Sequence, residues 1–209
     1  MNIFFEIHSG LPRQGPGDNA STAKAWSMIQ PQPPNPRILD VGCGPGMQTL
    51  ELAEFSQGTI VAVDTHLPFL EELRHSSRKR GLAGRIHPCR ASMFDLPFAD
   101  GTFDVIWSEG AIYNMGFEIG LRAWKRLLKP GGVVAVTEAV WLKSGPAPAE
   151  LAEFWNAEYP AIGTIEANMK LIEAAGYRSL GHFVLPASSW WDHYYQPIEA
   201  KLPALREKY

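Results

Sequence analysis

An apolar run that turns through three closely spaced glycines into a helical pattern constrains this chain more than any other feature. The run RILDV (37–41) predicts a buried strand, and Gly42, Gly44 and Gly46 follow it at a spacing of two, before a helical pattern that extends to about residue 56. Glycine lets a chain turn sharply and lets a ligand lie against bare backbone. This segment therefore predicts an α/β fold with a ligand site at the loop.

Strands and helices alternate along the chain beyond this loop. Apolar runs predict strands at 37–41, 59–64, 85–89, 103–108 and 133–140, and helical patterns predict helices at 20–30, up to 56, 68–81 and 116–128. Strands that alternate with helices of about 10–15 residues indicate a parallel sheet covered on both faces. Because only about five or six such units fit in the length, we expect an open, doubly wound, mostly parallel sheet of the α/β class rather than a closed barrel.

The sequence divides into three parts. Residues 1–36 form an N-terminal arm and helix, 37–140 form the core, and 141–209 form a C-terminal region. The arm is rich in glycine and proline over 9–19, so no regular element is expected there. In the C-terminal region we predict helices at 145–160 and 164–176, a sixth strand at 179–186, and a helical stretch over 189–209.

Composition excludes several classes of partner. The 209 residues carry 19 lysines and arginines against 22 aspartates and glutamates, a net charge of −3, which gives no positive field for nucleic acid. No apolar run approaches the ~18 residues that cross a bilayer, and the first residues show no secretion signal. Two cysteines, Cys43 and Cys89, form neither a disulfide framework nor a metal cluster. We expect a cytoplasmic monomer or homodimer that binds no metal and no membrane.

Two acids sharpen the interpretation of the glycine loop. Asp40 stands at the strand end just before the loop, where a carboxylate favours an ammonium group over a pyrophosphate. Asp64 ends the second predicted strand, where it can accept both hydroxyls of a ribose. The glycine spacing is G-x-G-x-G, whereas a dinucleotide site usually has G-x-G-x-x-G. A ribose with a nearby cation and no phosphate describes S-adenosylmethionine better than NAD.

Four motifs in order carry a resemblance to a known family. They are ILDVGCGPG (38–46), VAVDTH (61–66), ASMFDLPFADGTFDVIWSEG (91–110) and LKPGGVVAVTE (128–138). With them the chain resembles a class I S-adenosylmethionine-dependent methyltransferase of the small-molecule kind, related to the C-methyltransferases of ubiquinone and menaquinone biosynthesis. The resemblance covers residues 37–140 and implies a Rossmann-like fold, S-adenosylmethionine as cofactor and a small organic acceptor.

The resemblance also implies roles for individual residues in cofactor binding. Gly42 and Gly44 would present backbone to the methionine and ribose parts, Asp40 would face the ammonium, and Asp64 would hold the ribose hydroxyls. An aspartate of many relatives is replaced here by Ser92, which brings no charge to the adenine. The N-terminal arm is expected to close over the cofactor as a lid, with Arg13 and Gln14 near the methionine carboxylate. The remaining candidates for cofactor binding are Gln48, Thr65, His66, Met93 and Ser108.

The acceptor is expected at the carboxyl ends of the fourth and fifth strands, where ligands lie in open α/β sheets. Glu109 and Tyr113 are the candidate catalytic residues, and Asn114, Glu138 and Trp141 are the candidate substrate contacts. For Glu109, Tyr113 and Asn114 there is a structural alternative, in which they form a helix cap and a packed tyrosine. A general base is needed only if the acceptor must lose a proton.

Three functions remain open on the sequence alone. In-line methyl transfer to a small organic acceptor agrees best with the motifs, because alignment of the reactants can lower the barrier by ~7–11 kcal/mol. A cofactor-binding or interaction protein without catalysis, on the same scaffold, is the main alternative. An NAD(P)-dependent oxidoreductase shares the doubly wound sheet, but the glycine spacing disfavours it.

The resemblance also implies a seventh, antiparallel strand beside the fifth, and the sequence offers none. Residues 187–209 contain Pro197 and Pro203 and otherwise have a helical pattern. An unpaired strand edge leaves backbone groups without hydrogen bonds. We therefore expect the sixth strand to pair in parallel, another chain to supply the pairing, or the sequence to be a shortened version of a longer protein, which is the interpretation we favour.

Overall fold

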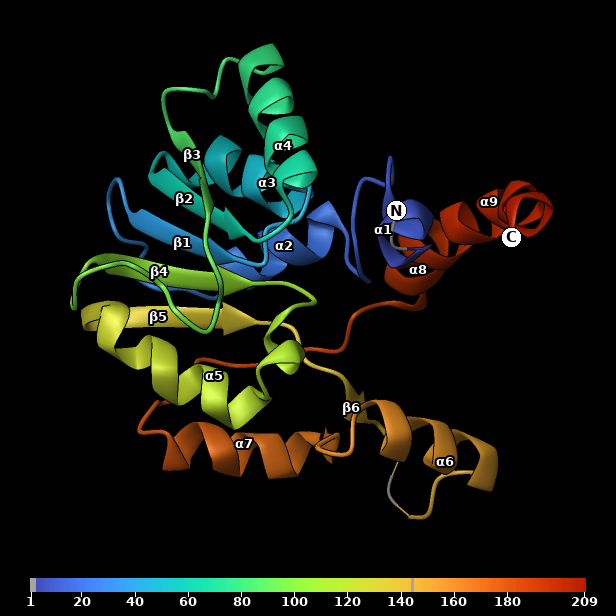
Figure 1. Cartoon of the computed structure of the whole chain (residues 1–209). Coiled ribbons are helices and arrows are strands. Elements are labelled where there is room, and N and C mark those ends of the chain that lie inside the picture. The colour runs from blue at the N-terminus through green and yellow to red at the C-terminus, as the bar shows by residue number, and fades with distance from the viewer. Residues whose placement is uncertain (1–2, 144) are drawn as a thin grey trace.

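A five-stranded parallel sheet forms the centre of the computed structural model, which describes residues 3–143 and 145–209 (Figure 1). The strand order is β3-β2-β1-β4-β5, so the chain runs outward in one direction and then crosses to the other side of β1. The strands are β1 (Arg37–Val41), β2 (Thr59–Asp64), β3 (Ile86–Arg90), β4 (Phe103–Ser108) and β5 (Leu128–Val136). The predicted doubly wound, parallel sheet is confirmed.

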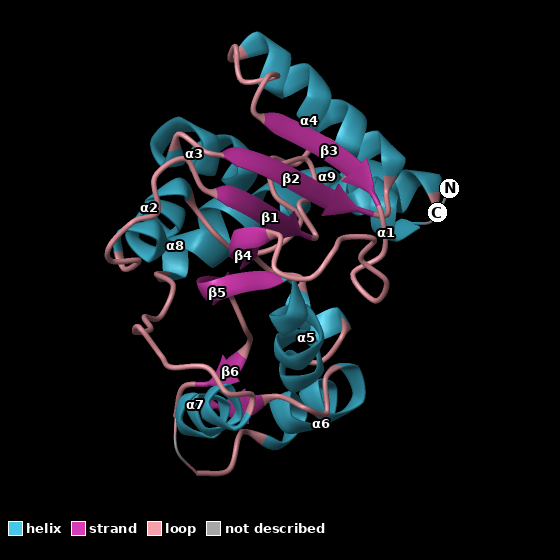
Figure 2. Ribbon diagram, turned by 90° about the vertical axis from the view of Figure 1, so that its left-hand side faces the viewer, coloured by secondary structure: helices cyan, strands magenta, loops and turns pink. Residues whose placement is uncertain are grey.

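Helices cover both faces of this sheet, as Figures 1 and 2 show. One face carries α2 (Asn19–Ser27), α3 (Met47–Ser56) and α4 (Leu67–Lys79). The other carries α5 (Phe117–Trp124) and α7 (Ile165–Ala174). Two apolar cores result, one on each side of the sheet.

Alternation along β1 divides the strand between the two cores. Ile38 packs with the α2–α3–α4 side, and its neighbour Leu39 packs with the α5–α7 side. Both are fully buried, as expected for a central parallel strand whose two faces are covered. The register pairs Ile38 with Ile60 on β2 and with Val105 on β4. This packing fixes the carboxyl ends of β1, β2 and β4 at one edge of the sheet.

The remaining elements lie around this core. Helix α1 (Ile3–His8) lies beside the last helix of the chain, with both termini on the same side of the molecule (Figure 1). The other elements are η1 (Ile112–Asn114), η2 (Lys125–Leu127), β6 (Val140–Trp141), α6 (Ala149–Glu158), β7 (Gly163–Thr164), α8 (Ala187–Trp190), the π-helical turn η3 (Trp191–Tyr195) and α9 (Gln196–Lys208). The predicted helical character of 189–209 is confirmed.

The predicted sixth strand at 179–186 is wrong. This segment has no regular structure, and the side chains of Leu180 and Val184 are about half exposed. Phe183 contacts α2 instead, because the Lys24 ammonium lies 4.2 Å from the centroid of its ring. Apolar, β-branched composition forms a strand only where the segment also pairs with a strand edge and buries one face. Residues 179–186 do neither, and the outer edge of β5 is left unpaired by the described residues.

The fifth strand is shifted relative to its prediction at 133–140. It spans 128–136, and the chain then leaves the sheet through Thr137, Glu138 and Ala139. Residues 140–141 pair with 163–164 in a separate two-stranded ribbon. Among the described residues, β5 pairs only with β4, and no strand pairs with the outer edge of β5.

Two features are absent from the described residues. No helix among them has the length and apolar character needed to span a membrane. No group of three or more histidine, cysteine, aspartate or glutamate side chains is placed to hold a metal ion within the same ranges.

Candidate active site

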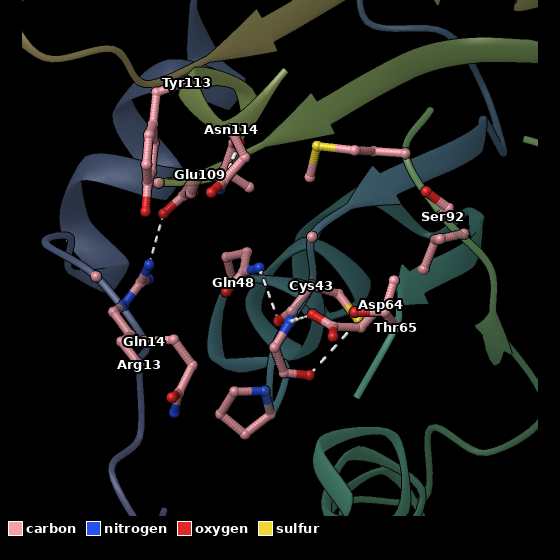
Figure 3. Close-up of a pocket in the computed structure, with 18 of the residues that line it drawn as sticks. Arg13, Gln14, Cys43, Gln48, Asp64, Thr65, Ser92, Glu109, Tyr113 and Asn114 are labelled. Atoms are coloured by element: carbon pink, nitrogen blue, oxygen red, sulfur yellow. Dashed lines mark hydrogen bonds and ion pairs between the residues drawn. The ribbon is translucent and has the colours of Figure 1, made fainter. Parts of the chain in front are cut away.

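A pocket of about 320 Å³ opens at the carboxyl ends of β1, β2, β3 and β4 (Figure 3). This size lies at the lower end of the range for small-molecule sites, about 300–1,000 Å³. The N-terminal arm closes one side of it. The lining consists of Arg13, Gln14, Gly15, Pro16, Gly42, Cys43, Gly44, Pro45, Gln48, Val63, Asp64, Thr65, Ala91, Ser92, Met93, Phe94, Glu109, Gly110, Ala111, Tyr113 and Asn114.

The glycine loop forms the floor of the pocket. Gly42 and Gly44 have φ angles of +73° and +55°, in the left-handed region that favours glycine. A Cβ atom on residue 42 would lie 2.4 Å from the Cβ atom of Ala111. The backbone N–H groups of Gly42 and Cys43 donate to the carbonyl of Val63 at 2.8 and 2.9 Å, which ties the loop to the end of β2. Bare backbone is therefore exposed to the pocket at a fixed position.

Asp64 braces the same loop from the end of β2. Its Oδ2 atom accepts from the N–H of Gly44 at 2.9 Å, and its Oδ1 atom accepts from the N–H of His66 at 2.8 Å. Each carboxylate oxygen has further lone pairs, and the side chain lines the pocket. The residue is half-buried, so it combines a fixed orientation with access to a ligand.

Asp40 lies fully buried near the loop. Its Oδ2 atom accepts from the Thr49 hydroxyl at 2.5 Å and from Gln48 Nε2 at 3.3 Å, and Gln48 Nε2 also donates to the carbonyl of Cys43. Its Oδ1 atom has no hydrogen-bond partner among the described residues. Burial and, to a lesser degree, the nearby negative charge of Glu109 raise the pKa of Asp40 to about 7, although hydrogen bonds from Thr49 and Gln48 oppose the shift.

Arg13 and Glu109 form a buried ion pair at the arm side of the pocket (Figure 3). Arg13 Nη1 lies 2.5 Å from Glu109 Oε2, and both side chains are less than a tenth exposed. Glu109 Oε1 also accepts from the Thr22 hydroxyl at 2.7 Å and from Trp107 Nε1 at 2.8 Å. Three donors, one of them an arginine, therefore fix the orientation of this carboxylate. The geometry favours an anchoring role for Glu109.

The pocket brings together most of the predicted site residues. Twelve of the seventeen line it, namely Arg13, Gln14, Gly42, Gly44, Gln48, Asp64, Thr65, Ser92, Met93, Glu109, Tyr113 and Asn114. The other five, which do not, are Asp40, His66, Ser108, Glu138 and Trp141. Ser108 is fully buried, its hydroxyl donates to the carbonyl of Val41, and its own carbonyl accepts from the N–H of Thr137.

The sequence interpretation missed several contacts of the site. Thr22 and Trp107 hold Glu109, although neither lines the pocket. Pro16 and Phe94 line it without a predicted role. Thr22 and Glu109 are 87 residues apart in the sequence, and no local pattern links them. Trp107 lies in β4 two residues before Glu109, so both side chains are on the same face of the strand. This spacing is the local signal that could have predicted their contact.

Glu138 and Tyr159 form a second acidic centre next to the pocket. Burial raises the pKa of Glu138 to about 7, and hydrogen bonds from Tyr159 and from the N–H of Ala139 partly oppose this shift. Burial and the adjacent Glu138 carboxylate raise the pKa of Tyr159 to about 12. The Tyr159 ring packs edge-on against Tyr113, with 6.0 Å between the ring centroids. Tyr113 thus connects this pair to the pocket.

Glu138→Gln should stabilise the protein at pH 8 by about 2 kcal/mol. The full shift from 4.5 to about 7 corresponds to ~3 kcal/mol, which we reduce because the side chain is only partly buried. Since the pKa is higher in the folded state, the unfolded protein ionises first, and the wild type loses stability as pH rises from about 4.5 to 7. The gain should therefore vanish near pH 4. Urea unfolding at both pH values measures it.

The exposed carboxylate of Glu153 on α6 supplies the control for this substitution. Glu153→Gln should leave the unfolding free energy unchanged within about 0.5 kcal/mol at both pH values. A Glu138→Gln variant that is as stable as the wild type at pH 8 would show that the acid is not held in its neutral form.

The fold and the pocket together define a class. A sheet of order β3-β2-β1-β4-β5, with a glycine loop after β1 and an acid at the end of β2, is the arrangement of the Rossmann-like folds, among which are the class I S-adenosylmethionine-dependent methyltransferases. Residues 39–136 match the family described as "Methyltransferase domain". This stretch of the chain is a methyltransferase domain.

Curated relatives agree with this assignment. The ubiquinone/menaquinone biosynthesis C-methyltransferase of Vibrio parahaemolyticus is 32% identical over 158 residues, which cover 72% of this chain and 58% of that protein. The sterol 24-C-methyltransferase of Eremothecium gossypii is 35% identical over 104 residues, which cover 49% of this chain and 28% of that protein. The chain thus spans less than two thirds of the length of these relatives.

Solved structures share the fold at low sequence identity. A methyltransferase from Thiobacillus denitrificans, in complex with S-adenosylhomocysteine, has a TM-score of 0.85 at 18% identity. The superposition covers 100% of this chain and 83% of that chain. One from Geobacter sulfurreducens, with the same ligand, has a TM-score of 0.84 at 18% identity and the same coverage. The predicted class I fold is therefore confirmed.

Proposed function

We propose that this protein transfers a methyl group from S-adenosylmethionine to a small organic acceptor by in-line displacement. The observation that carries the proposal is the buried Asp40 carboxylate, whose Oδ1 atom lacks a partner among the described residues. It lies close to the glycine loop, which Asp64 braces from the end of β2. S-adenosylmethionine offers an ammonium group for one acid and two ribose hydroxyls for the other. The hydrogen-bond donors of S-adenosylmethionine therefore fit the two carboxylates of Asp40 and Asp64.

Further residues fit the same cofactor. A Cβ atom on residue 44 would lie 3.2 Å from Gln14 Cγ, closer than an ordinary van der Waals contact, so the arm packs tightly over the loop there. Arg13 is buried and its Nε atom has no partner within the described residues. We assign this donor to the methionine carboxylate. Around the adenine we assign Thr65, Ser92 and Met93, and we assign Gln48 to the methionine part. His66 and Ser108 do not line the pocket, so we assign them no direct contact.

The acceptor is proposed to bind beside Tyr113 and Asn114, on the side of the pocket that faces Tyr159. Tyr113 is 45% exposed although it lines the pocket, so its phenol can contact an incoming molecule. Glu138, with a pKa near 7, is the candidate for a proton acceptor. Trp141 lies in β6, three residues further along the chain, and is the candidate for an apolar wall.

The chain's own residues would perform three tasks in this reaction. The glycine loop, Asp64 and Asp40 hold the donor in one orientation, the arm excludes water, and Tyr113 places the acceptor on the far side of the reacting carbon. The bound cofactor supplies an electrophilic methyl group. Glu109 acts through Arg13 as a positioning residue, because its carboxylate is already saturated by donors.

The experiment that tests the proposal is a methyl-transfer screen. The purified protein is incubated with a small-molecule metabolite extract and S-adenosylmethionine that carries a deuterated methyl group. We expect at least one metabolite to gain the labelled methyl mass, together with stoichiometric S-adenosylhomocysteine. The same extract with unlabelled cofactor, and with heat-inactivated protein, supplies the two controls.

Two results would contradict the proposal in different ways. Tight binding of S-adenosylmethionine with no labelled product from any extract would favour the non-catalytic alternative. Absence of cofactor binding by calorimetry, with nicotinamide dinucleotide retained instead, would favour the oxidoreductase.

We also propose that the protein works in the cytoplasm as a monomer or homodimer. Both cysteines are free thiols in the structure, and Cys43 is buried beside the glycine loop, where an unmodified thiol suits a reducing compartment. Size-exclusion chromatography with light scattering decides between the two oligomeric states.

A further inference from the structure

The part of the N-terminal arm between α1 and α2, residues 9–18, lies between the pocket and the C-terminal helices. Its inner side contributes Arg13, Gln14, Gly15 and Pro16 to the pocket lining. On its outer side, helix α1 packs against α9 and the arm continues past α8 (Figures 1 and 2). Residues 9–18 contain no helix or strand, so their position depends on contacts with other elements.

Lys201 of α9 is the main outer contact at the beginning of this arm. Its Nζ atom lies 2.8, 2.7 and 2.6 Å from the carbonyl oxygens of Glu6, Ile7 and Ser9. An ammonium group has three donors, and all three are used here. The carbonyls at the end of a helix have no intrahelical partner, and the partial negative charge there favours a cation. Lys201 therefore caps α1 from another part of the chain.

Two further contacts hold the arm on the same outer side. The ring of His8 stacks on Tyr194, with 5.9 Å between centroids, and His8 Nε2 lies 3.2 Å from the Tyr194 hydroxyl. At the other end of the arm, the N–H of Gly17 donates to the carbonyl of Ser189 at 3.1 Å, and the Ser189 hydroxyl donates to the Asp18 carboxylate. Both ends of the arm are thus fixed to residues 187–201.

We propose that α8, η3 and α9 form the outer layer of a two-layer lid, and that Lys201 is a positioning residue for cofactor binding although it lies outside the pocket. Arg13 and Glu109 hold the inner side of the arm, and Lys201, Tyr194 and Ser189 hold its outer side. Loss of an outer contact frees the arm and speeds departure of the cofactor. The inference rests on the proposal that the pocket binds S-adenosylmethionine.

The test compares Lys201→Met with Lys201→Arg and with the wild type. Methionine keeps the length and removes all donors, whereas the guanidinium can still donate to carbonyls. We expect Lys201→Met to speed amide hydrogen exchange over residues 9–18 at least tenfold and to weaken S-adenosylhomocysteine binding about tenfold. Lys201→Arg should restore most of both. Tyr194→Leu, which removes the second outer contact, should change both quantities in the same direction.

Lys170→Met is the matched control, since Lys170 is exposed on α7. It should match the wild type in arm exchange and in affinity. Arm exchange in Lys201→Met equal to that of the wild type would overturn the inference, and so would faster exchange with unchanged affinity. A wild-type protein that fails to bind S-adenosylhomocysteine would instead refute the proposed function, while the exchange data would still show whether Lys201 holds the arm.

Discussion

Gly46→Ala should lower the free energy of unfolding by about 2–5 kcal/mol. Gly46 precedes α3 with φ at +89°, a conformation that costs other residues ~1–2 kcal/mol. A Cβ atom there would also lie 2.3 Å from Leu73 Cδ1, in the fully buried core, and overpacking costs a further ~1–3 kcal/mol. Denaturant unfolding followed by circular dichroism measures the loss.

Gly81→Ala is the matched control, because it isolates the backbone cost. Gly81 has a similar φ of +71°, and a Cβ atom there would meet nothing within 4 Å. This variant should lose only ~1–2 kcal/mol. Equal losses of unfolding free energy in the two variants would show that close packing of residue 46 against Leu73 of α4 does not contribute to the effect.

Asp64→Ala should weaken binding of S-adenosylhomocysteine by about 10- to 150-fold. The carboxylate is expected to accept two charge-assisted hydrogen bonds from the ribose, worth ~1.5–3 kcal/mol. The same side chain braces the N–H of Gly44, so the substitution also loosens the loop that the cofactor contacts. Isothermal titration calorimetry measures the change.

Two further variants separate these contributions for Asp64. Asp64→Asn keeps one acceptor oxygen and should lose less affinity than Asp64→Ala. Asp100→Ala removes an exposed acid whose ion pair with Arg126 lies on the surface, and it should leave affinity unchanged. An Asp64→Ala variant with wild-type affinity would exclude the ribose assignment.

The core was predictable because its signals are local. Each of the strands β1 to β4 is an apolar run bounded by turn residues, and alternation with amphipathic helices implies the parallel sheet. The failure at 179–186 has a physical cause, since this segment does not pair with the outer edge of β5 and leaves Leu180 and Val184 about half exposed instead of burying one face. Composition alone does not report whether a segment pairs with an available edge.

The site was predictable in part for the same reason. Asp40, Gly42 and Asp64 stand at fixed offsets from predicted strands, and the fold carries them to one edge of the sheet. The ion pair of Arg13 and Glu109 joins residues 96 apart, and no local sequence pattern indicates such a contact. The saturation of Glu109 by three donors therefore required the structure.

A crystal structure of the protein with S-adenosylhomocysteine tests most directly the proposal that this pocket binds the cofactor. The account predicts the ligand in the pocket of Figure 3, with ribose hydroxyls within about 3 Å of the Asp64 carboxylate and the amino group directed at Asp40. It also predicts the arm closed over the ligand, with Arg13 at the methionine carboxylate. A ligand bound elsewhere, or in this pocket with its ribose away from Asp64, would contradict the account.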